Sequence, residues 1–136
     1  MLNRFKELME ANRTFAFETT GSGTNYVKHL KAAQTSGYEV HLLFLWLYSP
    51  DLAVQRVAHR VEQGGHYIPE EIIRRRYDLG LKNLIKHYLP LCDSVLVLDN
   101  SIAKANKVIA RKHINNDLKI EEPSIWREIQ EVAHAK

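Results

Sequence analysis

The chain has 136 residues, of which 45% are apolar and 26% are charged, a composition typical of one soluble globular domain over residues 1–136. Its single cysteine, Cys92, excludes an internal disulfide and a zinc site built from several cysteines. The formal charge of +3 permits binding to polyanions but does not require it.

Hydropathy along the chain predicts no membrane segment. The longest apolar stretch, Leu42 to Tyr48, is too short to cross a bilayer. The first residues mix charged and apolar side chains and lack the continuous apolar block of a signal peptide. We therefore expect a cytoplasmic location.

The first third of the chain predicts alternating helices and strands. Apolar residues at helical spacing over residues 2–9 indicate a helix, and the β-rich segment Thr14–Thr19 follows as a strand. A second amphipathic helix is predicted from Thr24 to Ser36, and Gly37 ends it. The apolar run from Tyr38 to Tyr48 is typical of a strand covered on both faces, so we expect it at the centre of a sheet.

The middle of the chain predicts a pair of helices. Ser49, Pro50 and Asp51 form a strong helix start, because Ser caps the first turn, Pro suits it and Asp complements the helix dipole. This helix should run to about Gln63, where two glycines break it. Pro69 then begins a long helix that we expect to continue through Tyr88.

The last third predicts strands and a final helix. Ser94 to Leu98 is a short apolar run of the buried-strand type, and it delivers Asp99 at its end. Lys107 to Ile120 resembles two short strands around Asn115–Asp117, and Ser124 to Ala135 is an amphipathic helix.

This order of elements predicts an α/β fold with right-handed parallel crossovers and three layers. Ligands of such sheets bind beyond the carboxyl ends of the strands. Three segments occupy such positions, namely residues 18–23, 49–51 and 99–101. These segments combine carboxylates with hydroxyl groups, which suits a polyhydroxylated substrate or a hydrated Mg²⁺ ion.

The segment from Arg56 to Tyr77 carries five arginines and two histidines around Gly64 and Gly65. An arginine guanidinium matches phosphate oxygens two at a time, so a movable segment of this kind can close over a phosphoryl group. Arg56 and Arg60 are spaced i and i+4 and lie side by side on one helix. The 136 residues nevertheless contain no G-x-x-x-x-G-K-[ST] phosphate-binding loop.

Several motifs together resemble the zeta-toxin-like branch of the P-loop kinases. They are FAFETT-x-SG at 15–23, GY-x-V at 37–40, FLWL at 44–47, RV-x-x-RV-x-x-GGH-x-IPEE-x-I-x-RRY at 56–77 and DNS at 99–101. They follow one another in a single order over roughly residues 5–110. The resemblance implies a nucleotide-kinase fold, and characterised members phosphorylate the sugar hydroxyl of UDP-N-acetylglucosamine with ATP and Mg²⁺. In those systems an antitoxin restrains the kinase, so the resemblance also implies an antitoxin-like partner.

The resemblance also implies roles for individual residues, with a lid over about residues 50–90. Asn100 and Ser101 would lie near the nucleotide base, while His66 and the two glycines would shape the lid turn. Gly21 departs from the family, where leucine is usual. The implied catalytic lid arginines are Arg56, Arg60 and Arg75, and the implied substrate-side residues are Glu18, Thr20, Ser22, His66, Arg74 and Arg76.

One part of the family pattern has no counterpart in these residues. In the family, a strand, the phosphate-binding loop, a helix and a strand ending in the catalytic aspartate precede the helix at 2–9. We therefore expect a P-loop kinase fold truncated at its N-terminus, which is inactive on its own and binds no ATP or Mg²⁺ tightly. The absent strand would lie between 14–19 and 38–48, so those strands should pair directly or through a homo-oligomer.

Three functions remain open from the sequence. The chain is a nucleotide-sugar kinase relative that is inactive alone, a non-catalytic module for a phosphorylated ligand or a partner protein, or a nucleic-acid binder. Only Tyr67 and Tyr77 interleave with the basic run, which argues against nucleic acid. The seven histidines lack metal-ligand spacing, so no metal site is expected.

Overall fold

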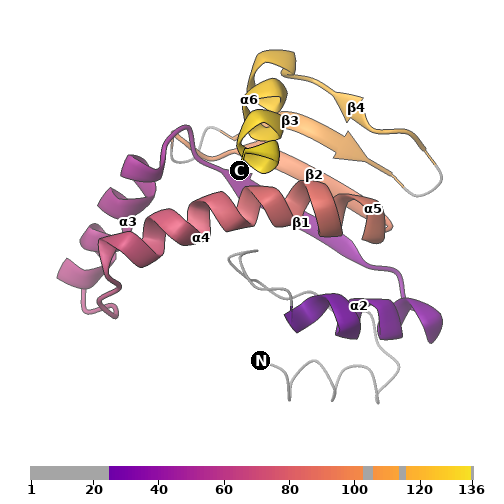
Figure 1. The fold of residues 1–136 in the computed structure, drawn as a ribbon, viewed down its shortest axis with the longest axis horizontal. Helices are drawn as coiled ribbons and strands as arrows, with labels where there is room; N and C mark the ends of the chain where they lie inside the picture. Colours follow the sequence, from indigo (N-terminus) through magenta and orange to yellow (C-terminus); the bar gives the residue numbers. More distant parts are fainter. Residues whose placement is uncertain (1–24, 103–105, 114–115, 136) are drawn as a thin grey trace.

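The computed structural model describes residues 25–102, 106–113 and 116–135 (Figure 1). The predicted helix at 2–9 and the predicted strand at 14–19 lie outside these residues. In chain order the elements are α2 (Asn25–Thr35), β1 (His41–Trp46), α3 (Pro50–Glu62), α4 (Glu70–Asn83), the π-helical turn η1 (Leu84–Tyr88), α5 (Leu89–Leu91), β2 (Ser94–Asp99), β3 (Lys107–Lys112), β4 (Lys119–Ile120) and α6 (Pro123–His134).

The four strands form one mixed sheet in the order β1-β2-β3-β4. β1 and β2 are parallel, with His41 opposite Ser94 and Trp46 opposite Asp99. β3 is antiparallel to both β2 and β4. The predicted parallel arrangement therefore holds for β1 and β2 but not for the whole sheet. The reason is the connection between β2 and β3, which is shorter than the dozen or so residues that a parallel crossover needs.

Helices α4 and α6 cover one face of the sheet (Figure 1). Their buried side chains meet those of β2 and β3 in a single core, which includes Leu81, Leu84, Tyr88, Val95, Val97, Ile109, Trp126 and Ile129. Burial of this set supplies the main stabilisation of the sheet and fixes which face of each strand points inward.

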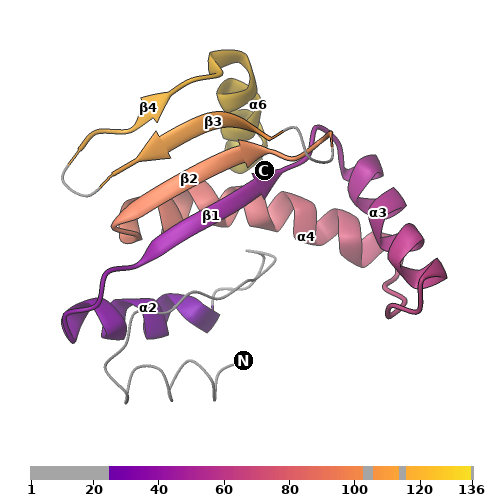
Figure 2. The ribbon, with the colours of Figure 1, turned by 180° about the vertical axis from the view of Figure 1, so that it is seen from behind.

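The opposite face of the sheet is open along β1. Figure 2 shows β1, β2 and β3 in front of α4 and α6. The side chains of Leu43 and Leu45 are 58% and 48% exposed. A three-layer arrangement is therefore not confirmed for the described part of the chain.

β1 begins later than the apolar run predicts. The backbone of Val40 is engaged by the segment before β2, since its N–H donates to Asp93 Oδ2 at 2.7 Å and its carbonyl accepts from the Asp93 N–H at 2.8 Å. Gly37 adopts φ +96° at the end of α2, as the predicted helix stop requires. The strand therefore starts at His41.

The helix starts follow the predicted chemistry. The Ser49 hydroxyl accepts a hydrogen bond from the Asp51 N–H at 3.1 Å, and Pro50 is the first residue of α3. The predicted long helix is divided, because α4 passes into the π-helical turn η1 before α5. The Lys112 ammonium then donates to the carbonyls of Leu89 and Cys92 at 2.8 and 3.0 Å, which satisfies the last turn.

Candidate functional site

The candidate site lies where β1 and β2 end side by side. Because these strands are parallel, the loops that follow them meet at one edge of the sheet. The Asn100 N–H donates to the Trp46 carbonyl at 2.8 Å, and the Tyr48 N–H donates to the Ser101 hydroxyl oxygen at 2.9 Å. The Ser101 N–H donates in turn to Asp99 Oδ1 at 2.9 Å. These bonds hold the two loops together.

Arg56 connects α3 to this edge. Its Nη2 donates to the carbonyls of Asn100 and Ser101 at 2.5 and 3.2 Å. Both contacts use one terminal nitrogen of a guanidinium that carries five N–H donors. The structure thus brings together three of the predicted site residues, Arg56, Asn100 and Ser101.

Tyr77 connects α4 to the same edge. Its hydroxyl donates to the Leu47 carbonyl at 2.6 Å. Burial raises the pKa of Tyr77 to about 12, and the charges of Asp78 and Glu128 act in the same direction. Near neutral pH the phenol is therefore protonated and serves as the donor. Sequence reasoning did not assign this residue to the site, although its position four residues after Ile73 places it on the core face of α4.

Arg74 joins α4 to α3. Its Nη2 contacts Asp51 Oδ1 at 2.6 Å and Glu70 Oε1 at 3.4 Å. The hydrogen bond to Asp51 is the largest cause of the raised pKa of Arg74, and Glu70 adds to it. Two carboxylates thus compensate the charge of Arg74, a predicted substrate-side residue.

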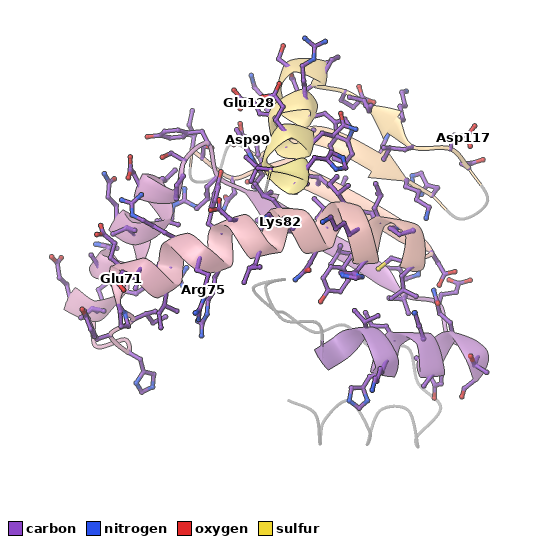
Figure 3. The ribbon with its side chains drawn as sticks, viewed as in Figure 1. Glu71, Arg75, Lys82, Asp99, Asp117 and Glu128 are labelled. Carbon is purple, nitrogen blue, oxygen red and sulfur yellow. The ribbon has the colours of Figure 1, made fainter. Side chains whose placement is uncertain are left out.

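The other three arginines of the cluster are exposed. Within the described ranges, Arg60, Arg75 and Arg76 make no ion pair or side-chain hydrogen bond. Arg60 lies one helical turn beyond Arg56, on the same side of α3. Consecutive helical residues point about 100° apart, so Arg74, Arg75 and Arg76 do not converge on one ligand. Arg75 extends from α4 away from α6 (Figure 3).

His66 follows the turn between α3 and α4. This turn lies at the end of α3 that is remote from the sheet (Figure 1), so the structure does not bring His66 to the strand ends. Gly64 has φ +94°, and the Gly65 N–H donates to the Arg60 carbonyl at 2.7 Å. A Cβ atom at Gly65 would lie 2.9 Å from that same oxygen. The tight return of the chain therefore requires glycine at this position.

The remaining predicted groups give no further ligands to this site. Glu18, Thr20 and Ser22 lie outside the described residues. Among residues 25–102, 106–113 and 116–135, no group of three or more histidine, cysteine or carboxylate residues could hold a metal ion. Cys92 is buried, and burial raises the pKa of its thiol to about 11, so it is not an activated nucleophile.

The sequence model of the zeta toxin family matches residues 3–107. The chain belongs to the zeta toxin family. Membership of the zeta toxin family agrees with the α/β fold of the described residues.

The chain is also similar to part of another protein. An uncharacterized protein of Haemophilus influenzae is 35% identical over 63 residues, which are 46% of this chain and 45% of that relative. The chain thus matches less than half of the relative's length. No solved structure matched the chain. No helix in the described part is long and apolar enough to span a membrane.

Proposed function

We propose that this zeta toxin family chain binds a phosphate-bearing nucleotide sugar at the ends of β1 and β2, and that it does not transfer a phosphoryl group on its own. The observation that carries the proposal is the arrangement of Arg56 and Arg60 on α3. Arg56 touches the loop after β2, and Arg60 is exposed one turn away, with no partner in the described ranges.

The charge balance favours an anionic ligand beside Arg60. Arg74 already contacts Asp51 and Glu70, so these two carboxylates compensate its charge. Arg60 has no such contact in the described part, and its planar fork suits two phosphate oxygens. Arg56, four residues earlier, lies on the same face of α3 and has further N–H donors besides those of Nη2. Together they offer charge-assisted hydrogen bonds to one phosphate group, with Arg75 as a further candidate from α4.

We expect no phosphoryl transfer, because the 136 residues lack groups that this reaction needs. Phosphoryl transfer needs backbone N–H groups and a lysine around the phosphates, together with a base for the accepting hydroxyl. The 136 residues contain no G-x-x-x-x-G-K-[ST] loop. Without these groups, the rate should fall by several orders of magnitude. In this proposal Glu18, Thr20 and Ser22 contact the sugar, and ATP with Mg²⁺ binds weakly.

The test is calorimetric titration of the 136-residue chain with UDP-N-acetylglucosamine and, separately, with Mg-ATP, followed by an assay for ADP when both are present. We expect binding of the nucleotide sugar, weaker or no binding of Mg-ATP, and no ADP. Arg60→Ala should weaken sugar-nucleotide binding roughly tenfold, as expected for loss of a charge-assisted hydrogen bond.

The matched control is Arg127→Ala on α6, which removes the same charge from an exposed position on a different helix. An equal loss of affinity in both variants would mean that only the net charge of the protein matters. It would contradict a direct contact between Arg60 and the phosphate. Production of ADP by the unmodified chain would contradict the second half of the proposal.

A further inference from the structure

We propose that Tyr48 and Ile102 form a stacking platform for the base of the bound nucleotide. This inference rests on the proposed function and adds the group that recognises the base. It assigns a role to one residue that the proposed function leaves out, Tyr48, whose ring stacks on the base of the nucleoside diphosphate moiety.

Both side chains are unusually exposed for their size. Tyr48 is 63% exposed and Ile102 is 71% exposed. They lie in the loops that follow β1 and β2, the two parallel strands whose ends form the site. A tyrosine ring has a flat π-face on which any nucleobase can stack. The apolar side chain of Ile102, in the adjacent loop, can contact the same base.

The backbone at Tyr48 and at Ser101, the residue before Ile102, is held in place by hydrogen bonds. The Tyr48 N–H donates to the Ser101 hydroxyl oxygen, and the residue after Ser101 is Ile102. The Ser101 carbonyl accepts from Arg56 at 3.2 Å, and its N–H donates to Asp99. Little ordering of the loops is therefore needed when a ligand binds, which favours affinity.

The phosphate donors belong to α3, the helix that contacts the loop after β2 through Arg56. Arg56 contacts the carbonyls of Asn100 and Ser101, and Arg60 is about 6 Å further along α3 at the rise of an α-helix. A ligand that spans both groups needs a flat apolar moiety at one end and negatively charged oxygens at the other. A nucleoside diphosphate has this form, whereas inorganic pyrophosphate can use only the arginines.

The experiment compares UDP with pyrophosphate, which lacks the base. Unmodified protein should bind UDP more tightly than pyrophosphate. Tyr48→Ala should weaken UDP binding roughly tenfold, the lower part of the range for one base stacked on an aromatic ring, and leave pyrophosphate binding unchanged. Tyr48→Phe keeps the ring and should bind UDP like the unmodified protein.

The control variant is Tyr67→Ala, because Tyr67 is a tyrosine of comparable exposure, 77%, in the turn remote from the strand ends. It should leave both affinities unchanged. A circular dichroism melt of each variant checks that the fold is intact.

Three results would overturn the inference. If Tyr48→Ala weakens pyrophosphate and UDP binding equally, Tyr48 supports the loops rather than the base. If the unmodified protein binds pyrophosphate as tightly as UDP, the base adds nothing, and only the phosphate proposal survives. If neither ligand binds at millimolar concentration, both proposals are wrong.

Discussion

Two arginines of one helix have separate structural roles. Arg56 donates to two carbonyls at the ends of the strands, whereas Arg60, four residues later, is exposed and has no contact of this kind in the described part. The sequence predicted that they lie side by side on α3. It could not separate them, because the Arg56 contacts join residues that are 44 and 45 positions apart.

This difference predicts that the two alanine variants change the free energy of unfolding by different amounts. Arg56→Ala should lower the free energy of unfolding by about 1–2 kcal/mol, since two half-buried carbonyls lose a charged donor. Arg60→Ala should change it by less than about 0.5 kcal/mol. Urea unfolding at neutral pH measures both, and a larger loss for Arg60→Ala would contradict the assignment.

Tyr77 predicts an alkaline loss of stability. The pKa of Tyr77 is raised from 10.0 to about 12 in the folded state, so the unfolded state loses this proton at lower pH. The contribution of Tyr77 to the free energy of unfolding is therefore complete below about pH 10 and falls as pH rises from about 10 to 12.

Tyr77→Phe tests this contribution. The variant loses the hydrogen bond to the Leu47 carbonyl, so at about pH 8 it should be less stable than the unmodified protein by about 1 kcal/mol. The difference should shrink as pH rises above about 10, because phenylalanine does not titrate. Urea unfolding at several pH values measures this difference in stability. A difference that grows with pH would contradict the assigned role of the Tyr77 hydroxyl.

At the scale of the elements, local chemistry determined the helices and long-range contacts determined the strands. Ser49, Pro50 and Asp51 predicted the start of α3, because capping depends on neighbouring residues only. The start of β1 and the antiparallel pairing of β3 with β2 were predicted less well. The bonds between Val40 and Asp93 span 53 positions, and no local pattern indicates them. The π-helical turn η1 also had no recognised signal.

The cap of α3 predicts a measurable effect. Ser49→Ala removes the hydroxyl that accepts from the Asp51 N–H and should lower the free energy of unfolding by about 1 kcal/mol. Ser49→Asp keeps a side-chain acceptor at this position and should retain most of the stability that the cap provides. Ser124→Ala in the first turn of α6 is the control, because the described residues include no hydrogen bond to its hydroxyl. Equal effects at both serines would argue against a specific cap.

At the scale of the whole molecule, the open face of β1 is the main departure from the predicted fold. The apolar run of this strand predicts cover on both faces, yet Leu43 and Leu45 are exposed, and β1 pairs only with β2 in the described part. Exposed apolar side chains on a strand of this kind favour association with another polypeptide.

We therefore expect the purified chain to self-associate through this face. Leu43→Lys should reduce the fraction of oligomer, because it places a charge on the open face. Leu79→Lys on α4 is the control, since Leu79 is an exposed leucine on a helix away from that face. Sedimentation velocity over a range of concentrations measures the change. A fully monomeric unmodified protein would show that the face does not promote self-association.

The central claim is that the arginine face of α3 binds phosphate at the strand ends. The most direct measurement is the affinity of the unmodified chain, Arg60→Ala and Arg127→Ala for UDP-N-acetylglucosamine, by calorimetry at one fixed salt concentration. We expect Arg60→Ala alone to lose affinity, by roughly tenfold. Binding that is unchanged in Arg60→Ala, or absent in the unmodified chain, would contradict it.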